Sequence, residues 1–599
     1  MSLLASPKLP VRLLLFLILF SLSATANATI QYSISLEHPE QHLFHVTMTI
    51  PDVKSEVTVQ MAAWNALYQI RDFSSHVRQV EASVEENKAP IETLDKQTWR
   101  IQANGTVTIR YATYWDEVGP FATQLNGEHA FINPAMILLY VPARRAENVV
   151  LRIPNPPENW RAASASFGRV DFVGKVPTFS YMSPNYDTLA DGPIEIGRFE
   201  EFDLGGVSPR VTVVVHGDKW RKKQIEQELK RICEYEIKLM EGAPFDRYTF
   251  ILHIGRGAGG GGMEHSYSTA IGVPSDEYLA GVAAHEFFHL WNVKRIRPAT
   301  LEPVDYTKEQ YTRALWFAEG VTSTYGSFTL VRSGIWSKER FYEDLGEQIT
   351  ELEGRPANRW QSAEQSSLDA WLEKYSLYNQ PEFSVSYYTK GQVLGDLLDI
   401  LIRDRTNNMK SLDDVLRAMN NDFAKQGKFY RDSLDVRLEA EKLAGGSFEE
   451  FFRKYVAGSE PFPYSPILSL AGLKLQTTEH RRAILGFTAE RDASGSLTVR
   501  SVEEDASAAQ AGLRGGDAII TWNGAEPPRR PGRWVTEQNP GDVLKLRVRR
   551  DDKEISLEFR LGEVKETIYE VLEDSQATEK ARRLREGMLR GDTTGSRQK

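Results

Sequence analysis

The sequence predicts a multidomain α+β protein with an N-terminal antiparallel β domain, a mainly helical middle region and a small C-terminal β domain. Three observations carry this prediction. The chain has 599 residues, which is more than one compact core accommodates. Apolar and polar residues alternate in its first third, and helical periodicity then dominates the middle region. The apolar fraction of 41% and the charged fraction of 26% are typical of a folded globular protein.

Residues 1–28 are predicted to be a secretory signal peptide. Lys8 and Arg12 precede a short apolar run, and small residues ending at Ala28 provide a cleavage site. The run is too short for a resident membrane-spanning helix. We therefore expect an exported protein, periplasmic or extracellular, with no stable membrane anchor after cleavage. The formal charge of -10 argues against non-specific nucleic-acid binding.

The mature chain divides by its hydrophobic pattern. Phe44, Val46, Met48 and Ile50 alternate with polar residues, as in a half-buried strand. Helical periodicity begins near Lys219, and a proline-rich break at 461–466 ends the helical region. Short strands with glycine turns follow, and then a charged helix. The predicted domains are 29–205 (β domain), 206–460 (helical domain), 467–562 (small β domain) and 563–599 (charged C-terminal helix and tail).

The motif HEFFH at residues 285–289 is the central chemical observation. On a helix, His285 and His289 share one face, so both imidazoles reach a single ion. A catalytic metal site also needs a third protein ligand and an open position for water. Glu319 fits, because an unpaired carboxylate in the apolar stretch 315–320 would be costly. Two core histidines four apart by chance, and a buried salt bridge at Glu319, are the alternatives.

These residues predict one zinc ion per chain, held by His285, His289 and Glu319. Glu286 is not a ligand in this scheme. It is expected to accept the proton of the water that attacks a peptide carbonyl. A capping box of Thr307 and Gln310 predicts where the helix carrying Glu319 begins.

Two longer segments carry a family resemblance. HEFFHLWNVKRIRP (residues 285–298) and LWFAEG (residues 315–320) closely resemble the glycyl aminopeptidase family of PDZ-containing zinc metallopeptidases, which is related to the aminopeptidase N group. The resemblance covers nearly the whole mature chain. It implies a thermolysin-like zinc peptidase domain at 206–460 and a PDZ domain at 467–562.

The segment GGMEH at residues 261–265 resembles the exopeptidase motif of aminopeptidases, whose glutamate binds the free α-amino group of the substrate. Aminopeptidase N has Asn at the last position, whereas the glycyl aminopeptidase group has His, as here. The resemblance implies substrate binding by Gly261, Gly262, Glu264 and His265. The alternative for Glu264 is an ordinary exposed loop residue.

The segment YTKG at residues 388–391 resembles the Y-x-K-G of the same superfamily. The resemblance implies that Tyr388 stabilises the oxyanion of the tetrahedral intermediate. A plain core aromatic is the alternative. The thermolysin-type E-x-x-x-D is absent, because Ser323 lies four residues after Glu319. The sequence therefore predicts no partner for the ligand histidines.

The third domain resembles PDZ domains in two places. Leu485-Gly486-Phe487 resembles their carboxylate-binding loop, and AGLRGGD (residues 511–517) with WNG (522–524) resembles a later turn and strand. Such domains add an extended peptide to a sheet edge and bind its terminal carboxylate. The resemblance implies a peptide or protein C-terminus as the ligand.

Three functions fit the sequence. The first is a zinc aminopeptidase acting on peptides with a free N-terminus, and its preference for small residues such as Gly or Ala is implied only by the family. The second is a zinc endopeptidase with an open cleft, against which Glu264 argues. The third is a non-catalytic PDZ-containing peptide-binding protein. Retention of the metal ligands together with Glu286 and Tyr388 argues against the third.

Overall fold

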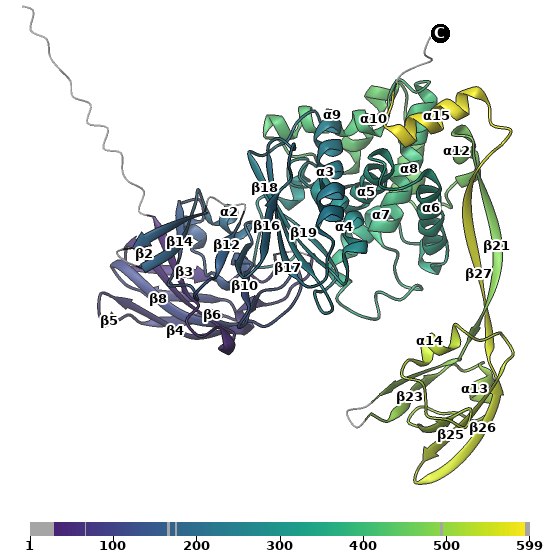
Figure 1. Cartoon of the computed structure of the whole chain (residues 1–599), viewed down its shortest axis with the longest axis horizontal. Coiled ribbons are helices and arrows are strands. Elements are labelled where there is room, and N and C mark those ends of the chain that lie inside the picture. The colour runs from purple at the N-terminus through teal and green to yellow at the C-terminus, as the bar shows by residue number, and fades with distance from the viewer. Residues whose placement is uncertain (1–28, 66, 165–167, 174–175, 492–494, 594–599) are drawn as a thin grey trace, which may run out of the picture.

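The computed structural model describes residues 29–65, 67–164, 168–173, 176–491 and 495–593. The predicted signal peptide and residues 594–599 of the predicted tail lie outside these residues. Three parts follow one another along the chain (Figure 1). They are an N-terminal β-sheet domain, a largely helical region that carries the predicted catalytic residues (called the catalytic region below) and a small β domain. Among the described residues, no helix is long and apolar enough to cross a membrane.

The N-terminal domain is built on an eight-stranded sheet. Its two central strands, β1 (Ile30–Ser35) and β2 (Leu43–Val53), pair antiparallel. Within β2, the side chains of Phe44, Val46, Met48 and Ile50 are buried, as their alternation predicts. A second sheet has the order β12-β15-β10-β9. It includes β12 (Arg161–Ala163), β15 (Ile194–Gly197), β10 (His129–Ile132) and β9 (Gln124–Leu125).

The catalytic region begins with a five-stranded sheet of order β16-β17-β18-β20-β19. Its strands are β16 (Glu200–Asp203), β17 (Arg210–Gly217), β18 (Arg247–Ile254), β20 (Ser268–Val273) and β19 (Gly261–Glu264). The three central strands run parallel, and β19 is an antiparallel edge strand in contact with α4 (Leu279–Phe288). The sheet edge therefore brings the GGMEH segment alongside the HEFFH helix.

Helices form the rest of this region. α3 (Lys222–Leu239) packs against α4, while α5 (Thr322–Arg332), α6 (Lys338–Glu353) and α8 (Tyr387–Arg405) lie beyond it. One large core joins the sheet and these helices. The single cysteine, Cys233 of α3, is fully buried within that core.

The predicted start of the helix carrying Glu319 is wrong. The Thr307 amide and hydroxyl donate to the Asp305 carboxylate at 2.9 and 2.7 Å, and the Gln310 side chain accepts from the Asp305 amide at 2.9 Å. These polar residues close a turn rather than cap a helix. The helix begins instead as a π-helical turn, Trp316–Val321, a geometry that is common at functional sites.

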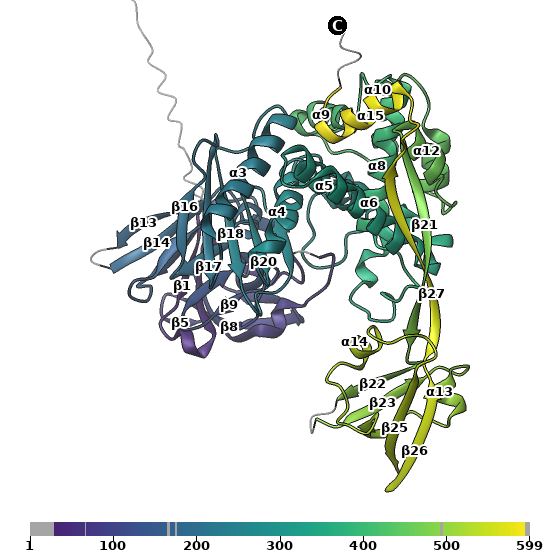
Figure 2. The same ribbon diagram turned by 45° about the vertical axis from the view of Figure 1, so that its right-hand side comes forward.

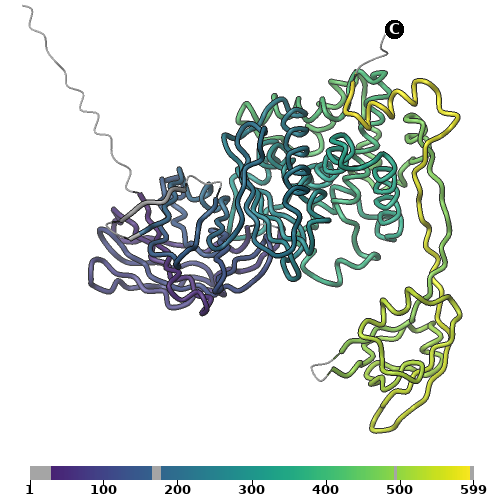
Figure 3. Tube along the Cα trace, viewed as in Figure 1, coloured from purple at the N-terminus to yellow at the C-terminus, as the bar shows by residue number. Residues whose placement is uncertain are grey.

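The small β domain is inserted into the catalytic region. Two long paired strands, β21 (Leu473–Ile484) and β27 (Gly562–Glu573), lead out to it and back (Figure 2). The domain itself is a five-stranded antiparallel sheet. Its strands are β22 (Phe487–Arg491), β23 (Leu497–Val502), β24 (Ala518–Trp522), β25 (Val543–Arg550) and β26 (Lys553–Arg560). The chain then returns as α15 (Glu579–Arg590), which packs on α5 and α8, so the predicted C-terminal helix is a docked element (Figure 3).

A buried guanidinium holds the returning helix. The side chain of Arg332 is fully buried, pairs with Asp413 at 3.0 Å and donates to the Met588 carbonyl of α15 at 2.8 Å. Removing one partner of a buried ion pair leaves the other charge unpaired. Arg332 is therefore one of the side chains that hold α15 in place, together with pairs such as Lys580 with Asp404.

We expect Arg332→Met to lower the free energy of unfolding by about 3–5 kcal/mol. The matched control is Arg340→Met, which removes an exposed pair with Glu347 and should cost less than about 1 kcal/mol. Urea unfolding followed by tryptophan fluorescence measures both changes. Equal effects of the two substitutions would contradict the role of Arg332.

Candidate active site

The three predicted metal ligands converge. His285 Nε2 and His289 Nε2 are 3.0 Å apart, and Glu319 Oε2 lies 3.5 and 3.1 Å from them, respectively. His289 and Glu319 are almost fully buried, and His285 is only slightly exposed. Ligand atoms on one tetrahedral zinc ion lie about 3.3–3.6 Å apart, given bonds of about 2.0–2.2 Å. The α4 helix and the π turn thus form a His₂Glu group of suitable dimensions for a divalent metal ion.

Both imidazoles are oriented so that Nε2 faces the shared point. His289 Nδ1 donates to the Asn292 carbonyl at 2.7 Å. His285 Nδ1 lies 3.2 Å from the hydroxyl of Ser323, which itself donates to the Glu319 carbonyl at 3.1 Å. Because the hydroxyl donates its only proton to the Glu319 carbonyl, Ser323 Oγ accepts the hydrogen bond from His285 Nδ1. These contacts leave the Nε2 lone pairs for a metal ion.

The sequence predicted no partner for these histidines, and Ser323 is the residue that it missed. Its position one helical turn after Glu319 was the available signal, because thermolysin-type sites carry their acidic partner there. A serine hydroxyl takes that position here and lies 3.2 Å from His285 Nδ1.

The site favours a positive charge at its centre. Burial by itself would lower the pKa of His289, but Glu319 outweighs burial and raises that pKa to about 10. Burial would likewise raise the pKa of Glu319, but His289 and His285 hold it well below its usual range. A metal ion competes with protons for the same atoms. The negative charge of Glu319 therefore favours a cation at the point that the three donor atoms share.

Glu286 points into the same space without being a ligand of this group. Its Oε2 is buried and has no hydrogen-bond partner among the described residues. Burial raises the pKa of Glu286 well above its usual range, and Glu264 and Glu319 raise it further. The carboxylate packs against the backbone of Gly262, where a Cβ atom would lie 2.3 Å from Glu286 Cγ. Glycine at 262 therefore allows Glu286 its position.

Tyr388 is brought to the metal ligands by two glycines. A Cβ on Gly320 would lie 2.5 Å from Gly391 Cα, and one on Gly391 would lie 2.2 Å from the Trp316 carbonyl. The π turn and α8 thus meet backbone to backbone. The Tyr388 ring lies 5.9 Å from the His285 ring, and burial, with Glu319, raises its pKa well above 10. The phenol is therefore a hydrogen-bond donor at neutral pH.

A cavity of about 360 Å³ opens in front of these residues. Glu264 lines it from β19, and one carboxylate oxygen each of Glu264 and Glu286 lies within 4.8 Å of a His289 nitrogen. The N-terminal domain also lines the cavity, through Trp64, Tyr68 and other residues. Sequence reasoning missed Tyr68, which no motif marks. The cleft is therefore shared between two domains.

His265 takes a different place from the other GGMEH residues. It is 1% exposed, and its Nδ1 lies 3.2 Å from the carboxylate of Asp191, a residue of the N-terminal domain. Burial would raise the pKa of Asp191, but Lys294 and His265 hold it well below its usual range. His265 thus faces the domain junction. Substrate binding by His265 stays a prediction. The geometry indicates that His265 stabilises the domain junction next to the cleft through its contact with Asp191.

The predicted carboxylate loop lies in the inserted domain. It joins β21 to β22 (Phe487–Arg491), an edge strand of the five-stranded sheet. Gly486 has φ of +67°, and its carbonyl accepts from the Glu503 amide at 2.9 Å. Leu485 is half-buried and Phe487 is buried. Whether this loop binds a carboxylate stays a prediction.

A buried His₂Glu group beside a carboxylate, at the base of a cleft between two domains, defines a metal-dependent hydrolase. Comparison with protein families identifies the class of hydrolase. Residues 31–198 match the Peptidase M61 N-terminal domain, and residues 278–394 match the M61 glycyl aminopeptidase domain. The chain carries both domains of the M61 glycyl aminopeptidase family, as its motifs predicted, and is a metallo-aminopeptidase.

One solved structure agrees in fold over nearly the whole chain. An aminopeptidase N family protein from Idiomarina loihiensis superposes with a TM-score of 0.81 at 27% identity, covering 94% of this chain and 100% of that chain. The M1 zinc metallopeptidase from Deinococcus radiodurans is more distant, with a TM-score of 0.46 at 12% identity over 73% of this chain and 95% of that one. A search of curated protein sequences gave no match.

We expect Gly262→Ala to lower kcat by about 100-fold or more, because the new methyl group displaces the Glu286 carboxylate. The fold should persist, since the side chain rather than the backbone must move. Gly260→Ala is the control, because a Cβ there meets nothing within 4 Å. Peptidase assays with thermal unfolding measure both variants, and equal kcat values would contradict the argument.

We expect Ser323→Ala to weaken zinc binding by about 10–100-fold, because His285 loses the acceptor that orients its ring. Competition with a fluorescent chelator measures the affinity. Ser333→Ala, at the end of the same helix, should leave it unchanged. Unaltered zinc affinity in Ser323→Ala would show that the hydroxyl does not orient His285.

Proposed function

We propose that this protein is a zinc-dependent aminopeptidase that removes N-terminal residues, preferably small ones such as Gly or Ala, from peptides in the periplasm. The position of Glu264 carries the proposal. Its carboxylate lines the cleft beside Glu286 and His289. A carboxylate there pairs with the α-ammonium group of a substrate. This contact places the first peptide bond of the substrate at the position of cleavage.

Zinc fits the donor set best. Two imidazoles and one carboxylate, with both Nδ1 atoms already hydrogen-bonded, are typical of catalytic zinc sites. His285, His289 and Glu319 would hold one ion there. When bound, zinc polarises the scissile carbonyl and makes water a stronger nucleophile.

The residues of this chain divide the remaining work. Glu286 takes a proton from the attacking water and passes it to the leaving amine. The phenol of Tyr388 donates a hydrogen bond to the oxygen that gains negative charge in the transition state. Glu264 binds the substrate ammonium throughout, so the scissile bond stays in register with Glu286.

The size of the cleft supports the proposed preference for small N-terminal residues. Its volume of about 360 Å³ lies near the lower end for ligand pockets, about 300–1,000 Å³. Trp64, Tyr68 and Phe121 occupy part of its wall. The family resemblance implies the same preference, and the predicted signal peptide supports export.

The inserted domain is proposed to be a PDZ domain, and the sheet with α3 and α4 to be thermolysin-like. The edge strand β22 follows directly on the Leu485–Gly486–Phe487 loop, as peptide addition to a sheet edge requires. A peptide or protein C-terminus is the expected ligand. A separate PDZ-based binding function would use this edge and not the metal cleft.

The test compares one peptide with a free and with an acetylated N-terminus, and identifies products by mass. We expect stepwise loss of N-terminal residues from the free peptide alone. Glu264→Gln should raise KM for the free peptide, because it removes the charge that pairs with the ammonium. Glu277→Gln, an exposed acidic residue before α4, is the matched control. Internal cuts in both peptides would favour an endopeptidase instead.

Glu286→Gln tests the chemical step separately. We expect loss of peptide hydrolysis with unchanged zinc content, because Glu286 handles protons and does not ligate the metal. Metal analysis and activity are measured on the same sample. Full activity in this variant would exclude Glu286 as the base.

A further inference from the structure

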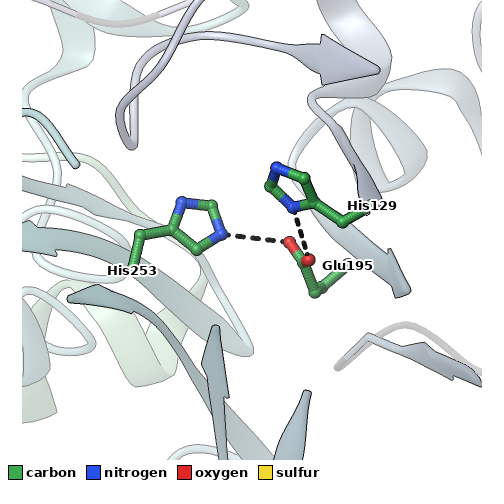
Figure 4. Close-up of side chains that lie close together, drawn as sticks. All are labelled: His129, Glu195 and His253. Atoms are coloured by element: carbon green, nitrogen blue, oxygen red, sulfur yellow. Dashed lines mark hydrogen bonds and ion pairs between the residues drawn. The ribbon is translucent and has the colours of Figure 1, made fainter. Parts of the chain in front are cut away.

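A second group of two imidazoles and a carboxylate lies where the N-terminal domain meets the catalytic sheet (Figure 4). His129 is on β10 and Glu195 on the neighbouring β15, while His253 is on β18. Their exposed fractions are 3%, 0% and 6%. This group shares no residue with the active site. Three strands from two domains thus bring metal-binding side chains to one buried point.

Glu195 lies between the two rings. Its Oε1 is 2.8 Å from His129 Nδ1, and its Oε2 is 3.0 Å from His253 Nε2. One ligand atom from each of the three residues lies within 4.8 Å of the others. Distances of about 3.3–3.6 Å separate ligands on one tetrahedral zinc ion. Small side-chain shifts would therefore admit an ion.

The proton on His129 can be traced. Gln124 donates its amide Nε2 to Asp116 at 2.8 Å, which directs its Oε1 toward His129 Nε2 at 3.1 Å. His129 Nε2 therefore carries a hydrogen. In the neutral ring, Nδ1 then presents a lone pair to the Glu195 carboxylate. A cation must lie between these two acceptors, either a second proton on the ring or a metal ion.

The buried charge of Glu195 needs such a cation. Among the described residues, its ion-pair partners are imidazoles rather than Lys or Arg. Neutral imidazole and carboxylate are preferred zinc ligands, and the same His₂Glu set forms the catalytic group of this chain. The Gln124 contact orients His129 in the way that outer partners orient metal-binding histidines.

The surroundings fix His129 closely. Gly197 lies opposite it in the β10–β15 pair, and a Cβ there would lie 2.6 Å from His129 Cβ. The ring of His216, on β17, stacks on the His129 ring at 4.1 Å with an interplanar angle of 3°. The imidazole is thus held on both sides. A preorganised ring of this kind is what a buried metal site requires.

We infer that His129, Glu195 and His253 form a second metal site, which binds zinc or a similar divalent ion and joins the N-terminal domain to the catalytic sheet. His129 Nδ1, His253 Nε2 and a Glu195 oxygen are the ligands, and a water molecule completes the coordination. The role of this ion is structural, because it lies outside the cleft. The inference does not depend on the proposed peptidase activity.

Metal content tests the site directly. Wild-type protein, saturated with Zn²⁺ and then desalted, should contain two zinc ions per chain by mass spectrometry of the elements. Glu195→Gln should contain one, and Glu128→Gln, an exposed neighbour of His129, should contain two. One zinc per chain in all three proteins would overturn the inference and identify an imidazolium–carboxylate pair instead.

A second measurement leaves the cluster intact, in case Glu195→Gln does not fold. The double variant His285→Ala with His289→Ala lacks the catalytic ligands. We expect it to bind one Co²⁺ with visible absorption of four-coordinate cobalt, and to unfold at a higher temperature with Co²⁺ than with a chelator. Absence of both the absorption and the shift in this variant would also overturn the inference.

Discussion

Contact between two glycine backbones fixes the geometry of the active site. Gly320 follows the predicted ligand Glu319, Gly391 lies in the first turn after Tyr388, and neither position has room for a Cβ atom. The π turn and α8 therefore approach more closely than side chains would allow. One steric constraint places the predicted metal ligand Glu319 and the phenol of Tyr388 in the same small space. The AEG motif supplies Gly320 to this contact, and the YTKG motif supplies Gly391.

Electrostatic repulsion is the second constraint on the site. Glu264, Glu286 and Glu319 gather around His289 in a buried cleft, where burial and the charges of Glu264 and Glu319 raise the pKa of Glu286. Such a cluster is stable only with positive charge nearby. The proposed divalent ion beside Glu319 and the proposed substrate ammonium beside Glu264 would supply that charge. The proposed cofactor and the proposed substrate class thus follow from one charge balance.

Residues that act through local spacing could be predicted from the sequence. His285 and His289 share a helix face, Glu319 stands out in an apolar stretch, and the alternation of β2 marks a strand. The roles of Ser323 and Tyr68 could not be predicted, because each depends on which element packs against it. The helix start at Trp316 was also missed, since the turn at Asp305 uses the same residue types as a capping box. Likewise, no local signal shows that α15 returns to the catalytic region.

The junction between the first two domains belongs to the catalytic apparatus. Asp191 of the N-terminal domain accepts hydrogen bonds from Lys294, five residues after His289, and from His265, directly after Glu264. One carboxylate thus connects the loops that follow both catalytic segments. The cleft has walls from both domains, so a shift of the junction moves its walls relative to its floor. The buried group around Glu195 lies at this same junction, where a bound ion would keep the two domains in register and preserve the width of the cleft.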